Sequence, residues 1–164
     1  MMDAAGVDIR AAAEFDVPLI LQFIRELADY ERKSQYVTAT EADLRAALFG
    51  PRPYAEALIA RAGDEPAGYA LYFHDFSTFR GRPGIYLEDL YVRPQHRHHG
   101  IGKALMARLA RICTERNCHR LQWAVLNWNE PALRFYRSLG AEPSTEWTVY
   151  SLDAQRLAAL ASPR

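Results

Sequence analysis

A short run of residues, 92–105, holds the side chains with the most evident chemical potential. Its sequence, VRPQHRHHGIGKAL, combines histidines, basic side chains and two glycines. Three kinds of site compete for this pattern: a histidine metal site, a basic arm for nucleic acid, and a loop that holds a phosphate. His96, His98 and His99 have no cysteine nearby and lack the ligand spacing typical of zinc sites. The metal site is therefore the weaker hypothesis.

The phosphate hypothesis accounts for more residues of this run. A strand is expected to end at Val92, and a helix to begin near Gly100. The first N–H groups of a helix have no intrahelical partner and carry partial positive charge, which suits an anion. Gly100 and Gly102 would let a phosphate approach the backbone, and Arg97 and Lys103 add positive charge. An ordinary tight turn between strand and helix remains the alternative.

The composition narrows the class of protein. A chain of 164 residues favours one domain, residues 1–164, and 49% hydrophobic residues can form a core. Equal numbers of basic and acidic residues, 20 of each, argue against nucleic-acid binding. No apolar run reaches the roughly 18 residues of a membrane span, and the N-terminus lacks the apolar segment of a secretory signal. Cys113 and Cys118 form no C-x-x-C pair, so we expect a reducing, cytoplasmic location.

Hydrophobic periodicity predicts alternating strands and helices. The expected strands cover 7–13, 54–62, 67–76, 85–92, 120–126 and 147–153. The expected helices cover 17–33, 40–49, 101–116, 129–140 and 154–161. A polar loop is expected at 77–84. The mixture predicts an α/β or α+β fold with one central sheet. Alternation in the strand at 85–92 places Glu88 on one face and Asp89 on the other.

Two motifs carry a family resemblance. RHHGIG (97–102) resembles the acyl-CoA pyrophosphate loop of the GNAT superfamily of N-acetyltransferases, whose pattern is Arg/Gln-x-x-Gly-x-Gly/Ala. NWNEPALRFYRSLGA (127–141) is similar to the asparagine and following helix of that family. ELADYE (26–31), YLED (86–89), WNEP (128–131) and Glu146-Trp147 resemble the diamine and thialysine N-acetyltransferases within it. The resemblance therefore covers nearly the whole chain.

The resemblance implies a fold and a cofactor. The fold is a twisted mixed sheet of six or seven strands, flanked by about four helices and usually found as a homodimer. Acetyl-CoA would lie where the central strands separate, and main-chain groups of Leu90, Tyr91 and Val92 would pair with its pantetheine arm. The further cofactor-binding positions by resemblance are Arg97, His98, His99, Gly100, Ile101, Gly102, Lys103, Asn129 and Arg137.

The implied reaction moves an acetyl group from a thioester to a primary amine by direct attack. A lysine-like amine has a pKa of about 10.4, so at neutral pH it is an ammonium ion that must lose a proton first. By resemblance, Glu88 is the candidate base. Tyr136 is the candidate acid, since a phenol stays protonated at neutral pH and can donate to the departing thiolate. An ordinary surface carboxylate and a core aromatic are the alternatives. No metal is implied.

The acceptor is expected to be a small cationic amine. Carboxylates and aromatic faces suit a long cation, and the resemblance assigns acceptor contacts to Tyr30, Glu31, Asp89, Trp123, Glu146 and Trp147. Ser77-Thr78-Phe79 replaces an acidic segment of the diamine enzymes, and Arg80 and Arg82 follow it. These changes weaken the case for polyamines and favour a lysine-like amine with its own carboxylate, such as thialysine. A peptide acceptor and a non-catalytic acetyl-CoA-binding module remain alternatives.

Overall fold

The protein is described here by a computed structural model of residues 6–162. The chain divides between Ala124 and Val125 into two compact units. The strands of the described residues all lie in the first unit, together with helices α1, α2 and α3. The second unit contains helices α4 and α5.

The first unit is built on one mixed sheet. Its strands are β1 (Val7–Ala11), β2 (Glu56–Ala62), β3 (Glu65–Ser77), β4 (Arg82–Val92) and β5 (Leu121–Trp123). They lie in the order β1-β2-β3-β4-β5. The first four are antiparallel, whereas β5 runs parallel to β4. The predicted fold class, a mixed sheet with flanking helices, is confirmed, although the described residues form five strands rather than six or seven.

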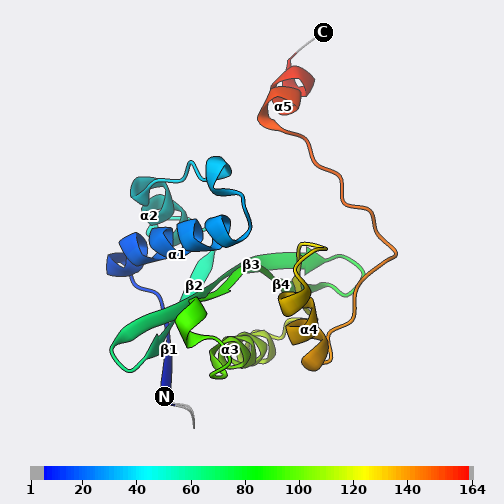
Figure 1. Ribbon diagram of the computed structural model, residues 1–164. Coiled ribbons are helices and arrows are strands. Elements are labelled where there is room, and N and C mark those ends of the chain that lie inside the picture. Colours follow the sequence, from blue (N-terminus) through cyan, green and yellow to red (C-terminus); the bar gives the residue numbers. More distant parts are fainter. Residues whose placement is uncertain (1–5, 163–164) are drawn as a thin grey trace. The chain divides into compact units, whose positions relative to one another are not determined.

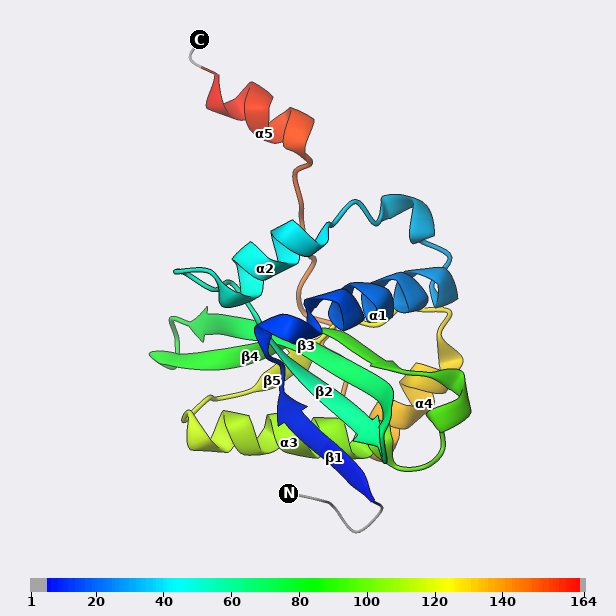
Figure 2. The ribbon, with the colours of Figure 1, turned by 90° about the vertical axis from the view of Figure 1, so that its left-hand side faces the viewer.

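Helices cover both faces of this sheet (Figures 1 and 2). They are α1 (Val17–Tyr30), α2 (Glu41–Phe49) and α3 (Ile101–Glu115), with 3₁₀ turns at Glu14–Asp16, Ser34–Tyr36 and Pro94–His96. α1 and α2 pack on one face over a core that includes Phe23, Tyr69 and Tyr91. α3 packs on the other face and buries the predicted apolar positions Ile101, Leu105, Leu109 and Ile112. Below, the two sides are called the α1 face and the α3 face.

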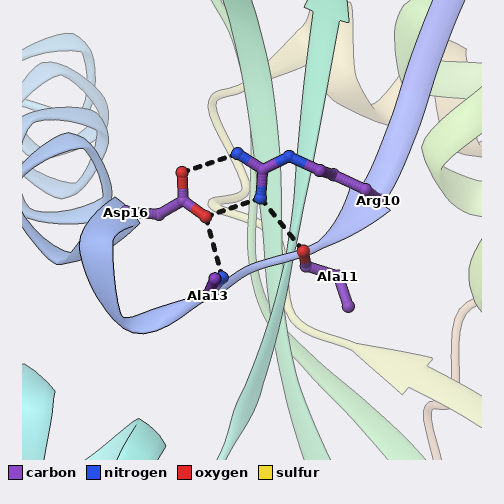
Figure 3. Close-up of polar contacts among 4 residues, drawn as sticks. All are labelled: Arg10, Ala11, Ala13 and Asp16. Carbon is purple, nitrogen blue, oxygen red and sulfur yellow. Dashed lines mark hydrogen bonds and ion pairs between the residues drawn. The ribbon is translucent and has the colours of Figure 1, made fainter.

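An ion pair joins the first strand to the first helix (Figure 3). Arg10 donates from Nη1 to Asp16 Oδ2 at 2.6 Å and from Nη2 to Oδ1 at 2.7 Å. Asp16 Oδ2 also accepts the Ala13 N–H at 2.8 Å. The Arg10 guanidinium therefore holds the pKa of the buried Asp16 carboxyl below its usual value. This pairing ties β1 to the turn that precedes α1.

The second unit contains α4 (Glu130–Ser138) and α5 (Ala154–Ala161), both close to their predicted positions. The strand predicted at 147–153 is wrong, because residues 142–153 form no ladder and run as an extended connection (Figure 1). A strand needs a neighbour for its backbone hydrogen bonds. The alternating pattern of 147–153 has none within the part of the chain that the structure describes.

Two further boundaries differ from the predictions. The loop predicted at 77–84 shrinks to a turn at 78–81, because β3 extends to Ser77 and β4 begins at Arg82. Strands can remain paired at a hairpin end even where their side chains are polar. Composition alone therefore predicted a loop longer than the observed turn. The strand predicted at 120–126 pairs with β4 only over Leu121–Trp123.

Candidate active site

A break in the sheet register lies at the predicted base. Leu71 of β3 pairs with Asp89 of β4, and the next residue, Tyr72, pairs with Leu87. Glu88 is therefore left without a partner in this ladder. One extra residue on one strand is a β-bulge, which re-aims side chains and is common beside active sites.

The bulge corrects the predicted faces of this strand. Leu87 pairs with Tyr72, whose phenol contacts Glu56 on the α3 face, whereas Asp89 accepts from Tyr69 on the α1 face. Odd-numbered residues thus change face across Glu88, and the expected continuous alternation is wrong. The charge of Glu88 acts on Tyr69 and on Tyr86. Glu88 and Asp89 are electrostatically coupled, since the charge of Asp89 raises the pKa of Glu88.

Three carboxyl groups gather at this point: Glu31 at the end of α1, and Glu88 and Asp89 on β4. Partial burial raises the pKa of all three. The charge of Asp89 raises the pKa of Glu31 and Glu88 further, while Lys33 acts in the opposite direction on Glu31. Mutual repulsion without full neutralisation makes the cluster a good acceptor for a cation or a proton.

A buried phenol holds one of these carboxyls. Tyr69 Oη donates to Asp89 Oδ2 at 2.6 Å. The Tyr69 ring is fully buried and stacks on Phe23, with centroids 5.2 Å apart and an interplanar angle of 6°. The hydrogen bond lowers the pKa of Asp89, against the larger effect of burial. Nothing in the sequence singled out Tyr69, because its partner is set by the register between β3 and β4.

The sheet opens next to the bulge. On its β5 side, β4 pairs only through Ile85, Tyr86 and Leu87, and Leu87 lies opposite Trp123 at the end of β5. Within the first unit, no described strand pairs with residues 88–92 on that side. Trp123 therefore lies beside the bulge, and Leu90, Tyr91 and Val92 present an edge on which an extended ligand could add like a strand.

The loop that follows β4 contacts the end of α1. The guanidinium of Arg97 lies 4.8 Å from the ring centroid of Tyr30 and 5.8 Å from that of Tyr91. Its Nε donates to the Val92 carbonyl oxygen at 2.9 Å. The structure thus brings together residues predicted for the cofactor and for the acceptor.

Backbone conformation explains two loop positions. Gly100 is the N-cap of α3 at φ 80°, and a Cβ added there would meet no atom within 4 Å. His98 also adopts a left-handed conformation, with φ 64°. Glycine adopts this conformation without strain, and histidine tolerates it better than most residues. His98, His99 and Lys103 are exposed, and Ile101 is buried.

A second arginine anchors the start of the loop. Arg93 donates to both carboxylate oxygens of Glu26, at 3.0 and 2.8 Å, and to the Pro66 carbonyl oxygen at 3.0 Å. Its guanidinium lies 4.8 Å from the centroid of the Phe23 ring. Sequence reasoning missed this clamp, although Glu26 belongs to the ELADYE motif. It ties the loop to α1.

One histidine of the loop, His96, lies beside a carboxylate. His96 Nε2 lies 3.3 Å from Glu65 Oε2. Among residues 6–162, no three or more histidine, cysteine or acidic side chains gather as a metal site would require. None of the described helices combines the length and apolar character needed to cross a membrane.

The second unit carries the other predicted residues. Asn129 is buried and caps α4, accepting the Ala132 N–H at 3.3 Å. Tyr136 lies on α4, with its ring centroid 5.3 Å from that of Phe135, and Arg137 is exposed in the last turn. Glu146 and Trp147 lie on the extended connection, where Trp147 is 74% exposed. The roles of these five residues stay predictions.

Comparison with known proteins identifies the family. Residues 21–141 match the model of the acetyltransferase (GNAT) family, so the chain belongs to that family. The match includes the carboxyl cluster, the loop at 93–100 and α4. The protein is accordingly an acyl-transferring enzyme of the GNAT type.

Individual relatives agree with this assignment. A thialysine N-epsilon-acetyltransferase from Bos taurus is 40% identical over 96% of this chain and 98% of its own length. An L-ornithine N5-acetyltransferase from Arabidopsis thaliana is 26% identical over 93% of this chain and 86% of its own. Among solved structures, an integron cassette protein from the mobile metagenome of V. cholerae has a TM-score of 0.80. It is 29% identical to this chain, and the match covers 96% of this chain and 99% of that protein.

Proposed function

We propose that this enzyme transfers the acetyl group of acetyl-CoA to a primary amine of a small cationic acceptor, by direct attack of the amine. The observation that supports this most is the carboxyl cluster of Glu31, Glu88 and Asp89 beside the open edge of β4. The cluster suits an ammonium ion, and the edge suits an extended acyl carrier. Their adjacency is what amine acetylation requires.

The residues present fit acetyl-CoA. The open edge of Leu90, Tyr91 and Val92 would pair with its pantetheine arm. The N-terminus of α3 would hold the pyrophosphate through backbone N–H groups, with free space at Gly100. Acetyl-CoA supplies the thioester whose acyl carbon the amine attacks. The remaining proposed cofactor contacts are Arg97, His98, His99, Ile101, Gly102, Lys103, Asn129 and Arg137.

The chain's own groups would then move the protons. Glu88 accepts a proton from the acceptor ammonium, directly or through a water molecule, and its raised pKa makes it a stronger base than an ordinary glutamate. Backbone N–H groups near Leu90 to Val92 stabilise the negative charge that develops on the carbonyl oxygen. Tyr136 donates a proton to the departing thiolate. We propose that both units belong to one acetyltransferase domain, residues 1–164, which the family match at 21–141 supports because it extends into both.

The proposed acceptor is a lysine-like amine. By family resemblance its contacts are Tyr30, Glu31, Asp89 and Trp123 of the first unit and Glu146 and Trp147 of the second. Relatives named for thialysine and for L-ornithine acetylation support this class, since both are amino acids with a side-chain amine. These amino acids also have a carboxylate, which polyamines lack, and Arg80 and Arg82 at the hairpin between β3 and β4 weaken the case for a purely cationic polyamine.

One assay tests both parts of the proposal. Purified enzyme is incubated with acetyl-CoA, and thiol release is measured with thialysine, lysine, ornithine, spermidine, spermine and a lysine-containing peptide. We expect kcat/KM to be largest for the amino acids. Thiol release with the peptide alone would reject a small acceptor, and no release with any amine would reject the enzymatic proposal.

We also propose a homodimer in the cytoplasm. Three exposed apolar side chains of the second unit, Trp147, Val149 and Tyr150, are between 74% and 90% accessible and would gain from a partner surface. Both cysteines are free thiols, which is compatible with a reducing compartment. Light scattering at micromolar concentration should give twice the chain mass of 18.7 kDa, and the mass of one chain would reject the dimer.

A further inference from the structure

The hydrogen bond between Tyr69 and Asp89 joins β3 to β4 beside the bulge at Glu88. Tyr69 would be anchored by its ring alone, since the ring is fully buried and stacked on Phe23. Its hydroxyl nonetheless reaches 2.6 Å to Asp89 Oδ2, immediately after the bulge. A short phenol–carboxylate hydrogen bond is of the strong, charge-assisted kind.

We propose that Tyr69 is a positioning residue that holds the Asp89 carboxylate ionised and correctly oriented for the acceptor ammonium. The inference rests on the proposed function and deepens it, since it assigns a specific support to the acceptor site. Tyr69 itself touches neither acceptor nor acetyl group in this proposal. It acts through Asp89.

The electrostatics of the cluster explain why Asp89 needs such support. Asp89 lies near two other carboxyl groups, Glu31 and Glu88, and is partly removed from water. Removal from water favours the protonated form of Asp89, which would have no attraction for a cation. A phenol can donate to a carboxylate but cannot itself neutralise the charge. Tyr69 therefore keeps Asp89 anionic while leaving its charge available.

Among the described residues, Asp89 lacks a basic partner, and this supports the same proposal. Among the described residues, no lysine or arginine forms an ion pair with Asp89. A buried structural carboxylate normally has such a partner. The acceptor ammonium would complete the pair. This reasoning also distinguishes Tyr69 from Tyr72, whose carboxylate partner Glu56 is already paired with Arg116.

The test is Tyr69→Phe, which keeps the ring and its stacking and removes only the hydroxyl. We expect KM for the amine to rise about tenfold, the scale of one hydrogen bond to a charged group. KM for acetyl-CoA should stay unchanged. Tyr72→Phe is the matched control, because it removes a phenol–carboxylate bond from the same strand on the α3 face. It should leave both KM values unchanged.

A double-mutant cycle separates positioning from general loosening. If Tyr69 acts through Asp89, then adding Tyr69→Phe to Asp89→Asn should cause no further rise in amine KM. Equal rises in both backgrounds, or a rise in the two KM values together, would overturn the inference. Wild-type amine KM in Tyr69→Phe would also overturn it and leave the proposed function intact. A wild-type enzyme that acetylates no amine would instead overturn both.

Discussion

Two tyrosines of β3 make the same kind of bond in opposite electrostatic settings. Tyr69 donates to Asp89 on the α1 face, and Tyr72 donates to Glu56 on the α3 face. Glu56 also accepts hydrogen bonds from both terminal nitrogens of Arg116. This guanidinium holds the pKa of the Glu56 carboxyl below its usual value. Burial raises the pKa of Asp89 instead. One carboxylate is neutralised within the fold and the other is not.

The contrast separates a structural pair from a binding site. Burial raises the pKa of Tyr72 to about 12 and raises that of Tyr69 well above its ordinary value, so both phenols remain donors. What differs is the cation. The α3 face contains its own, in Arg116, whereas the α1 face gathers Glu31, Glu88 and Asp89 and leaves a negative charge to be matched from outside.

The largest effect on turnover is expected when the proposed base, Glu88, is removed from the carboxyl cluster of the α1 face. Glu88→Gln should lower kcat roughly 10²- to 10⁴-fold, because an amide cannot accept the ammonium proton. The matched control is Glu56→Gln, which alters the neutralised carboxylate on the other face and should retain kcat. Steady-state kinetics with the preferred amine measures both. Near-wild-type kcat in Glu88→Gln would remove Glu88 from the mechanism.

A similar effect is expected from the second unit. Tyr136 on α4 is the proposed donor to the departing thiolate, a role that rests on the family resemblance. Tyr136→Phe should reduce kcat by roughly 10²- to 10⁴-fold. Acetyl-CoA affinity, measured by calorimetry, should stay near the wild-type value. Phe135→Leu, on the neighbouring position of α4, is the control and should preserve kcat; unaltered turnover in Tyr136→Phe would contradict its assignment.

Asp16 extends the comparison to a buried carboxylate that is fully paired. Asp16→Asn should reduce the free energy of unfolding by about 1.5–3 kcal/mol at pH 7, the value of a hydrogen bond to a charged group. The pKa of Asp16 is lowered from 3.8, so its stabilisation is present above that value and is lost as pH falls through the folded-state pKa. Urea unfolding at a series of pH values from 7 to well below 3.8 checks this. A cost that stays constant over the whole series would show that the charge is unimportant.

The smallest effect is expected to have the opposite sign. The pKa of Asp89 is raised from 3.8, so the native state binds its proton more tightly than the unfolded chain does. Ionised Asp89 therefore destabilises the fold at neutral pH, and this cost disappears as pH falls below 3.8. Asp89→Asn should raise Tm at pH 7 by about 2–4 °C, equivalent to about 1 kcal/mol, while amine acetylation falls. Differential scanning calorimetry would contradict the charge argument if Tm fell.

Much of the fold followed from local pattern. The helices at α1, α2, α3 and α4 were predicted within a few residues, because amphipathic spacing and caps such as Thr40 and Asn129 act within one helix. The strand at 147–153 was predicted from the same kind of pattern and is absent. Strand formation depends on a partner elsewhere in the chain, which local pattern cannot supply.

The sequence by itself determined the family, the α/β class and the identity of the chemical groups. Arg97, Gly100, Glu88 and Tyr136 are visible as types at recognisable spacing. Only the tertiary structure decided how those groups meet. The bulge at Glu88 adds one residue to β4 and reverses the faces beyond it, so that Asp89 meets Tyr69 on the α1 face. A register shift is a property of two strands together, and no periodicity within either strand records it.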